Sequence, residues 1–270
     1  MKIGIVGLGK MGSALAQALS AKYEISGYEK SNEAASALRP SLLKKISLAE
    51  SLEALVEKTE TLIIATKPAQ VAEVATAVTD HRLVISIAAG VALKTIDAAR
   101  GENGPTVRAM PNTPLLIRRG ITAFTGNRFC AGEDLALARE IFENTGTAIY
   151  LEQEKLLHAV TGLSGSGPAY VYLFLQNLED AGVLLGLSRA DSRALALQTV
   201  LGSAELARQS HEAPQNLIHD VTSPGGTTAV ALKSLHRHGF PNAVMEAVTA
   251  ATRRSVELAA EAKLPPGTGD

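Results

Sequence analysis

The sequence contains one cysteine in 270 residues, Cys130, so no disulfide can form within one chain. This count favours a reducing, cytoplasmic setting. Net charge is also nearly absent, because 26 basic residues face 27 acidic ones. Without a strong field of one sign, neither nucleic acid nor an anionic membrane surface is expected as a partner.

Long apolar runs are missing as well. A membrane-spanning helix needs about 18 uninterrupted apolar residues, whereas polar residues interrupt the best candidate, residues 170–187. The apolar run at residues 3–8 contains glycines and ends before Lys10, so it is too short for a secretory signal peptide. We therefore expect a soluble protein without a targeting segment. A frayed tail is expected at residues 264–270, where proline and glycine gather.

The chain divides into two halves with different periods. In residues 1–152, short runs rich in isoleucine and valine alternate with stretches of helical period. This pattern predicts an α/β domain with a doubly wound sheet of parallel strands and crossover helices. The predicted strands are residues 2–7, 24–28, 61–66, 82–87, 106–109, 121–125 and 148–151, and the predicted helices are residues 11–21, 32–38, 69–78 and 133–142.

In residues 153–270 the strand pattern stops and apolar stripes at spacings of three and four take over. This half is predicted to be an all-helical domain. The stretch at residues 168–185 is apolar on more than one face. Such a helix must be buried at the centre of its domain or covered by a second subunit, and we expect an intertwined homodimer.

The first motif is the turn Gly7-Leu8-Gly9-Lys10-Met11-Gly12, which has the spacing G-x-G-x-x-G. It follows a predicted strand and opens a predicted helix, the context of a Rossmann-type dinucleotide site. The first glycine allows the tight turn, the second lets a pyrophosphate approach the backbone, and the third allows close packing of helix on strand. The helix N-terminus is expected to hold the pyrophosphate.

The end of the second predicted strand is expected to distinguish NADH from NADPH. Glu29 stands where a carboxylate would accept a hydrogen bond from the ribose 2′-hydroxyl and repel a 2′-phosphate. Lys30 and Ser31 argue for the opposite preference, because a cation and a hydroxyl could hold that phosphate. The cofactor is therefore predicted to be NADPH or NADH, with the choice open.

Three further segments follow predicted strands at their carboxyl ends, where ligands of open α/β sheets bind. Each alone could be ordinary loop chemistry, but their convergence on one sheet edge favours a cofactor site. From these segments we expect the cofactor to contact Thr66, Lys67, Pro68, Ala88, Ala89, Gly90, Met110, Pro111 and Asn112.

The second motif, residues 220–228, precedes an apolar helical stretch in the second half. Ser223 is expected to cap that helix and Pro224 to lie in its first turn, while Gly225 and Gly226 expose backbone N–H groups. With the hydroxyls of Ser223, Thr227 and Thr228 around it, this helix tip reads as a nest for a small carboxylate. The alternative is a well-capped helix start without a ligand.

The third motif, residues 161–170, is rich in glycine and serine. It lacks the spacing and the preceding strand of a serine hydrolase elbow. We interpret it as a loop at the domain junction that closes over the cofactor, with Thr161 as a wall of the site. The six histidines form no metal-binding pattern, and no metal is expected.

Together, residues 6–12, 66–68, 86–90, 108–114, 161–170 and 220–228 resemble the Δ1-pyrroline-5-carboxylate reductase family over nearly the whole chain. The resemblance implies reduction of 1-pyrroline-5-carboxylate to L-proline, the last step of proline biosynthesis, by NADPH or NADH. It implies a Rossmann-type domain and a helical dimerisation domain, with dimers that join into larger rings in some members. NADPH is slightly favoured on this ground, although Glu29 departs from the habit of the NADP-preferring members.

Under this resemblance each residue of the helix tip receives a role. Ser223 and the backbone N–H groups of Gly226 and Thr227 bind the substrate carboxylate, beside Gly225, and the Thr228 hydroxyl hydrogen-bonds the ring nitrogen. Two rivals remain. A β-hydroxyacid dehydrogenase or another imine reductase would share the domain plan, but Lys155 and Lys233 do not match the lysine position of the former. A catalytically silent nucleotide-binding protein would not need the hydroxyl-rich tip.

Overall fold

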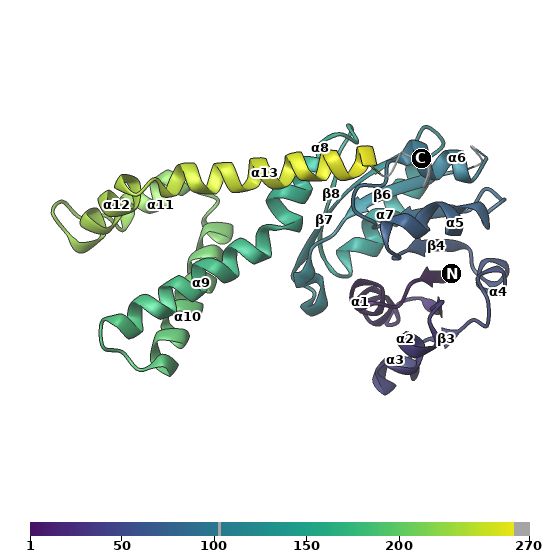
Figure 1. The fold of residues 1–270 in the computed structure, drawn as a ribbon, viewed down its shortest axis with the longest axis horizontal. Coiled ribbons are helices and arrows are strands. Elements are labelled where there is room, and N and C mark those ends of the chain that lie inside the picture. Colours follow the sequence, from purple (N-terminus) through teal and green to yellow (C-terminus); the bar gives the residue numbers. More distant parts are fainter. Residues whose placement is uncertain (102–103, 262–270) are drawn as a thin grey trace, which may run out of the picture. The chain divides into compact units, whose positions relative to one another are not determined.

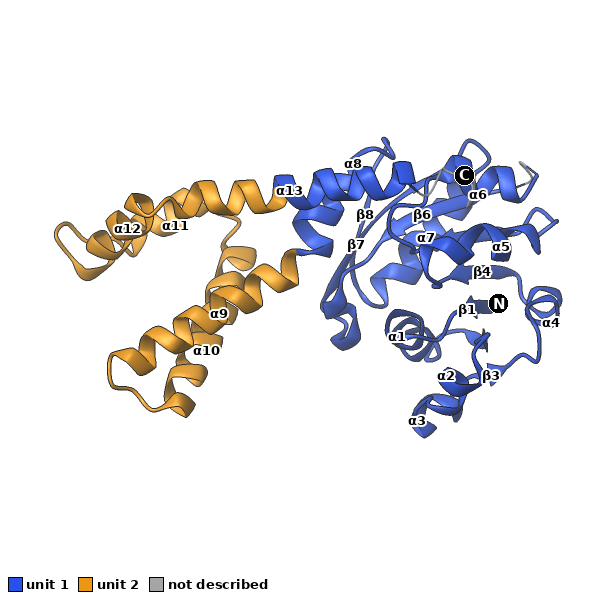
Figure 2. Ribbon diagram, viewed as in Figure 1, with its two compact units in different colours: residues 1–166, 249–270 blue, residues 167–248 orange. Residues whose placement is uncertain are grey.

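The computed structural model describes residues 1–101 and 104–261, which form two compact units (Figure 2). Among the described residues, unit 1 comprises the chain up to Ser166 and Thr249 to Glu261, and unit 2 comprises Gly167–Val248. The division differs from the predicted boundary after residue 152 because residues 156–160 contact two strands of the sheet, and the end of the last helix contacts His158 and Gly90. The tail expected at residues 264–270 lies outside the described residues.

Unit 1 is built on an eight-stranded sheet with the order β3-β2-β1-β4-β5-β6-β7-β8 (Figure 1). Its strands are β1 (Lys2–Val6), β2 (Glu24–Tyr28), β3 (Ser47–Leu48), β4 (Thr61–Ile64), β5 (Leu83–Ser86), β6 (Thr106–Met110), β7 (Gly120–Gly126) and β8 (Gly146–Tyr150). The pairing is parallel except between β6 and β7. The expectation of parallel strands is wrong there, since too short a connection joins these two strands for a crossover helix.

Short helices and longer ones alternate with the strands of unit 1. They are α1 (Lys10–Leu19), α2 (Asn32–Ser36), α3 (Pro40–Leu43), α4 (Leu52–Lys58), η1 (Pro68–Gln70), α5 (Val71–Thr76), α6 (Leu93–Ala99), η2 (Thr113–Ile117), α7 (Gly132–Glu143), α8 (Leu156–Val160) and η3 (Thr161–Gly165), with the end of α13 (Phe240–Glu261). The sequence pattern missed β3, α3, α4 and α6, because two to seven residues are too few to establish a period.

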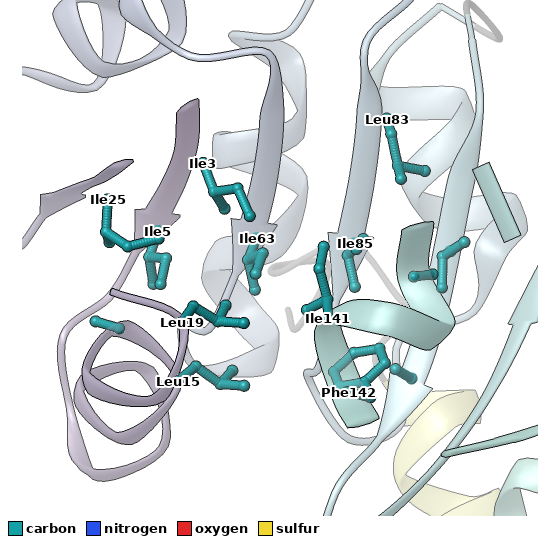
Figure 3. Packing of buried hydrophobic residues seen from close by; sticks show 14 of the residues in the cluster. Ile3, Ile5, Leu15, Leu19, Ile25, Ile63, Leu83, Ile85, Ile141 and Phe142 are labelled. Atoms are coloured by element: carbon teal, nitrogen blue, oxygen red, sulfur yellow. The ribbon is translucent and has the colours of Figure 1, made fainter. Parts of the chain in front are cut away.

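The core of unit 1 lies on both faces of the sheet. Consecutive strand residues point to opposite faces, and accordingly Ile63 packs in one buried cluster while Leu62 and Ile64 pack in the other. Helices α1 and α7 cover the first face, where Leu15 and Phe142 are fully buried (Figure 3). Helices α4, α5 and α6 cover the second. The result is three layers that hold the carboxyl ends of the central strands in place.

Unit 2 consists of helices. They are α9 (Gly167–Leu184), α10 (Arg189–Ser210), α11 (Pro214–Asp220), α12 (Thr227–Arg237) and the beginning of α13. Helices α9 and α10 pack closely at Gly182. A Cβ there would lie 2.5 Å from the Ser192 hydroxyl oxygen, so the absence of a side chain allows this approach. The Phe174 and Phe240 rings lie 6.1 Å apart between their centroids. Among the described residues, no helix has the length and apolarity that crossing a bilayer requires.

Candidate functional site

The three fingerprint glycines have three different surroundings. Gly7 has a φ of +88°, which favours glycine, and its N–H donates to the Tyr28 carbonyl at 2.8 Å. A Cβ at Gly12 would lie 1.9 Å from the Gly7 carbonyl oxygen, so helix α1 could not approach the strand with any other residue. A Cβ at Gly9 would meet nothing within 4 Å. The turn is therefore closed at its first and third glycines and open at the second.

The N-terminus of α1 is available to an anion. Gly9 is its N-cap and supplies no side chain, so no side chain bonds the first N–H groups of this ten-residue helix. Its first turn also holds no acidic residue. The partial positive charge at this end of the helix is thus not compensated by the helix itself.

A pocket of about 300 Å³ lies beside this turn, at the carboxyl ends of β1, β2 and β4. Six of the predicted cofactor residues line it: Gly7, Gly9, Glu29, Lys30, Thr66 and Lys67. The other turn residues, with Ser31 and Pro68, do not. Further lining residues were not predicted from the sequence. Among them are Leu52 and Glu53 of α4, Gln70 of η1 and Glu73 of α5. Helix α4 had no recognisable period, and nothing in the sequence indicates which residues of α5 turn toward the pocket.

A second groove, of about 760 Å³, runs along α1 between α3 and η2. It is the larger of the two, and Leu8 and Lys10 line it. It shares only Gly9 with the first pocket. None of its lining residues belongs to the segments directly after β4 or β5, residues 65–68 and 87–90. Since ligands of open α/β sheets bind at the carboxyl ends of the strands, we assign the candidate site to the smaller pocket.

The residues after β2 are held by a network of hydrogen bonds. The Glu29 carboxylate accepts from the Leu8 N–H at 2.9 Å and from the Ser31 N–H at 3.2 Å. Lys30 Nζ lies 2.7 Å from Glu73 Oε1, and this contact raises the pKa of Lys30. The Ser31 hydroxyl accepts from the Ala34 N–H at 3.2 Å and caps α2. Each of the three groups therefore has a partner.

Thr66 behaves differently. Its hydroxyl oxygen is buried and has no hydrogen-bond partner in the described part of the chain. A buried hydroxyl without a partner costs free energy, and Thr66 lines the pocket. Together with the open space at Gly9, this hydroxyl fits a polar ligand such as a dinucleotide.

The remaining predicted segments lie along the same edge, since β4, β5 and β6 are neighbouring parallel strands. Ala88, Ala89 and Gly90 form the turn after β5, where Gly90 has a φ of +77°. Leu258 and Ala259 of α13 border Gly90, within 3.8 Å of the position its Cβ would take. Met110, Pro111 and Asn112 end β6 and lead into η2. The structure thus places all three segments along one edge of the sheet, although only Thr66 and Lys67 among their predicted residues line the pocket.

A partly buried ion pair ties this edge to the segment before α8. Glu154 Oε1 lies 2.8 Å from Arg108 Nη1 and also accepts from the Leu93 N–H at 2.8 Å. The Arg108 side chain is 4% exposed and that of Glu154 is 29% exposed, so the cation is buried and the carboxylate is partly open to solvent. It joins β6, the start of α6 and the segment before α8.

Residues 161–165 form a π-helical turn, so the interpretation of this segment as a loop is wrong. The Ser166 N–H donates to the Thr161 carbonyl at 2.8 Å, and the Thr161 hydroxyl donates to the Leu157 carbonyl at 2.8 Å. The glycines serve close packing rather than flexibility, because a Cβ at Gly165 would lie 2.6 Å from Met110 Cε. Asn112 Nδ2 also donates to Ser164 Oγ at 3.3 Å, which ties the turn to the end of β6.

In unit 2, the helix tip predicted at residues 223–228 begins one turn later than expected. Gly226 is the N-cap of α12, so the predictions of Ser223 as its cap and Pro224 in its first turn are wrong. Ser223 to Gly226 form a β-turn in which the Gly226 N–H donates to the Ser223 carbonyl at 3.0 Å. Pro224 at the second position and Gly225 at the third, with a φ of +70°, suit a type II turn.

The tip leaves its donors available. No side chain caps α12, which has eleven residues, and Thr227 and Thr228 form its first turn without an acidic residue. The Ser223 hydroxyl reaches over the tip, since a Cβ at Gly226 would lie 2.4 Å from its oxygen. The predicted residues of the carboxylate nest are thus neighbours on one helix end of unit 2.

Comparison with known proteins bears on both halves of the chain. Residues 2–90 match the family model for NADP oxidoreductase, coenzyme F420-dependent, and residues 154–258 match the model for pyrroline-5-carboxylate reductase dimerisation. A pyrroline-5-carboxylate reductase from Synechocystis sp. is 39% identical over 264 residues, which cover 96% of this chain and 98% of that protein. The chain belongs to the pyrroline-5-carboxylate reductase family.

Solved structures of family members agree with this assignment. The Plasmodium falciparum pyrroline carboxylate reductase, crystallised with NADP bound, has a TM-score of 0.86 at 34% identity and covers 96% of this chain and 98% of its own. A pyrroline-5-carboxylate reductase from Coxiella burnetii has a TM-score of 0.88 at 31% identity, covering 95% and 97%. The expected fold, an α/β Rossmann-type domain followed by a helical dimerisation domain, is confirmed.

Proposed function

We propose that this protein reduces 1-pyrroline-5-carboxylate to L-proline with NADPH or NADH, the last step of proline biosynthesis. The observation that carries the proposal is its relation to named pyrroline-5-carboxylate reductases over nearly the full length of both chains. The match includes the helical half, so it extends beyond the glycine fingerprint that many dehydrogenases share.

The nucleotide half of the site would lie in unit 1. The open turn at Gly9 and the N-terminus of α1 would hold the pyrophosphate, and the Thr66 hydroxyl would gain the partner it lacks. The turn at Ala88–Gly90 and the residues from Met110 to Asn112 would border the nicotinamide. When bound, the cofactor supplies a hydride to the C=N carbon of the substrate.

The substrate half would be the tip of α12. Ser223 and the N–H groups of Gly226 and Thr227 would bind the carboxylate, because they form an uncapped helix end with a hydroxyl above it. The Thr228 hydroxyl would hydrogen-bond the ring nitrogen, which keeps its proton as the adjacent carbon accepts the hydride. Thr161 would contribute a wall of the site. Such positioning of reactants is worth roughly 7–11 kcal/mol in well-oriented reactions.

The assembly we propose is a homodimer in the cytoplasm. The match to a dimerisation model and the exposed apolar side chains of unit 2 support it. Rings of dimers, which the resemblance implies for some members, would build on this dimer. Light scattering coupled to size-exclusion chromatography distinguishes one dimer from a ring.

The decisive experiment measures oxidation of NADPH and of NADH with pyrroline-5-carboxylate, and compares it with reduction of NADP⁺ and NAD⁺ by 3-hydroxy acids, the substrates of the dehydrogenase rival. We expect turnover of the imine and none of the hydroxy acids. Turnover of a hydroxy acid alone would favour the dehydrogenase rival, and binding of cofactor without any turnover would favour a silent binding protein.

Two substitutions test the assigned roles. Thr228→Ala should lower kcat/KM with little change in cofactor affinity, whereas Ser223→Ala should chiefly raise KM, because the carboxylate is bound in ground and transition states alike. The matched control is Thr222→Ala, since the Thr222 hydroxyl donates to the Ile218 carbonyl at 2.5 Å. Unchanged kinetics in both test variants would remove the helix tip from the mechanism.

A further inference from the structure

We propose that the pocket of unit 1 selects NADH over NADPH, with Glu29 and the Lys30–Glu73 ion pair as the specificity determinants. The inference rests on the proposed function for the identity of the nucleotide. It settles the choice that the sequence left open between a repelling carboxylate and a binding cation.

Glu29 is held at the edge of the pocket by two backbone hydrogen bonds. Both of its carboxylate oxygens are fixed by backbone N–H groups, from Leu8 on the fingerprint turn and from Ser31. The side chain therefore lies at the end of β2 and borders the pocket. A carboxylate at this position accepts from the 2′-hydroxyl, and a 2′-phosphate would meet a like charge there.

Lys30 is already engaged. Its Nζ lies 2.7 Å from Glu73 on α5, and both side chains line the pocket. To bind a 2′-phosphate, the Lys30 ammonium would have to break its contact with Glu73 or contact the carboxylate and the phosphate at the same time. Because the carboxylate would remain beside the phosphate in either case, the gain from Lys30 would be largely cancelled.

The balance of the other charges points the same way. Among the described residues lining the pocket, the carboxylates are Glu29, Glu53 and Glu73 and the cations are Lys30 and Lys67. Since Lys30 and Glu73 neutralise each other, the remaining charges of the lining are one cation, Lys67, and two carboxylates, Glu29 and Glu53. Glu53 stays ionised at neutral pH, because hydrogen bonds from its own backbone N–H and from Ser51 lower its pKa.

The usual phosphate partner is also missing. None of the described residues that line the pocket is an arginine, whereas sites that take a 2′-phosphate commonly present one, which can bond two oxygens at once. The Ser31 N–H donates to Glu29 and the Ser31 hydroxyl oxygen accepts from the Ala34 N–H as the cap of α2, and Ser31 does not line the pocket.

The test is equilibrium binding of NADH and NADPH to the full-length protein without substrate, measured by calorimetry. The pair 5′-AMP and adenosine 2′,5′-bisphosphate repeats the comparison with the adenosine half alone. We expect NADH to bind about tenfold more tightly than NADPH or better, which is about 1.4 kcal/mol. Equal affinities, or tighter binding of NADPH, would overturn the inference.

Glu73→Gln frees Lys30 without touching the turn. It should improve NADPH affinity about two- to fivefold, the range that exposed ion pairs span, and leave NADH affinity nearly unchanged. Glu29→Gln keeps an acceptor for the Leu8 N–H but removes the negative charge, so it should also reduce the preference for NADH over NADPH. The control is Glu57→Gln on α4, an exposed acid outside the pocket.

The outcomes separate this inference from the proposed function. If Glu73→Gln changes both nucleotides equally, or if Glu57→Gln has the same effect, the ion pair is not a determinant. If NADH is preferred in binding but pyrroline-5-carboxylate is not reduced, the function fails and the selectivity stands. If the imine is reduced with a preference for NADPH, the proposed function stands and the inferred selectivity for NADH fails.

Discussion

The two units bury their apolar side chains to very different extents. Unit 1 encloses large side chains such as Phe124, Phe142 and Ile63 completely, in two clusters that sandwich its sheet. In unit 2 the buried residues are Ser192 and Ala196 alone among those described, while many leucines, valines and aromatics are at least a third exposed. One unit has a core within the chain, and the other does not.

The difference teaches where each unit obtains its stability. Exposed apolar faces of this extent mark surfaces that pack against another protein, and the match to a dimerisation model concerns this part of the chain. The sheet unit should therefore be stable as a single chain, whereas the helical unit should depend on its partner. The dimer is accordingly part of the fold of unit 2.

The largest expected effect comes from placing charge on the apolar face of α10. Leu197 and Leu201 lie one helical turn apart and are 54% and 59% exposed in the single chain. The double substitution L197E/L201E should abolish the dimer, because each leucine removed from an interface costs roughly 1.5–3 kcal/mol and each dimer loses four. Light scattering should then report the 28.2 kDa of one chain, or an aggregate.

The matched control carries the same change into unit 1. Leu43 and Leu48 are 41% and 45% exposed, so L43E/L48E replaces two leucines that are also exposed, though somewhat less, by glutamates. It should leave the mass of the dimer unchanged. A dimer that survives L197E/L201E would show that α10 lies outside the interface.

The next largest effect concerns the core of unit 1. Phe142 is fully buried and its ring centroid lies 6.2 Å from that of Phe124. Phe142→Ala should destabilise unit 1 by about 3–5 kcal/mol, and chemical denaturation should show the same loss at every protein concentration. Phe129→Ala, at a ring that is 39% exposed, is the control and should cost much less. A cost for Phe142→Ala that varies with concentration would mean that unit 1 also depends on the partner.

The fingerprint glycines separate folding from binding within unit 1. Gly12→Ala forces a Cβ against the Gly7 carbonyl and should destabilise the unit by about 1–3 kcal/mol, as overpacking does. Gly9→Ala has room in the folded chain, so thermal unfolding should be unchanged while NADH binding weakens. If Gly9→Ala binds NADH normally, the pyrophosphate does not approach the turn at that residue.

These glycines also indicate what a sequence can reveal. The G-x-G-x-x-G spacing predicts the turn and the helix after it, because only glycine satisfies the positive φ of Gly7 and the close approach at Gly12. Lys30 illustrates the limit. Its partner Glu73 is 43 residues away, and no local pattern couples the two. The Lys30–Glu73 contact depends on how α5 packs against the sheet, which only the fold determines.

The other two sequence motifs show the same limit in another form. Glycine and serine at residues 161–167 indicate flexibility when read locally, yet Gly165 is required by contact with Met110, which is 55 positions earlier in the chain. Ser223 and Pro224 have the residue types of a helix start, but a β-turn uses them one turn before α12 begins. Composition drew attention to these segments, and packing against other parts of the chain decided their conformation.

A smaller effect is expected at a glycine of the helical unit. Gly202 lies within α10, and only Gln198 Nε2, at 3.9 Å, comes near the place of a Cβ. Gly202→Ala should therefore stabilise the helix by about 0.5–1 kcal/mol, in contrast to Gly12→Ala. Thermal unfolding shows whether the substitution raises or lowers the stability of the protein. Loss of the dimer in this variant would instead mean that the partner approaches the backbone at Gly202.

The smallest expected change is in the reactivity of Cys130, which is the sole cysteine of the sequence and lies in unit 1. Burial raises the pKa of its thiol to about 11. Since the thiolate is the reactive form, labelling by iodoacetamide near pH 8 should be about a hundredfold slower than for an unperturbed cysteine. Labelling therefore reports on the surroundings of this thiol in unit 1.

This readout tests the independence of the two units directly. In L197E/L201E the helical unit loses its partner, but the contacts of Cys130 with Thr106 and Asn127 belong to unit 1. Labelling should stay as slow as in the unchanged protein, because the opening of unit 1 is governed by its own core. Faster labelling in that variant, with L43E/L48E unaffected, would mean that the sheet unit gains stability from the dimer after all.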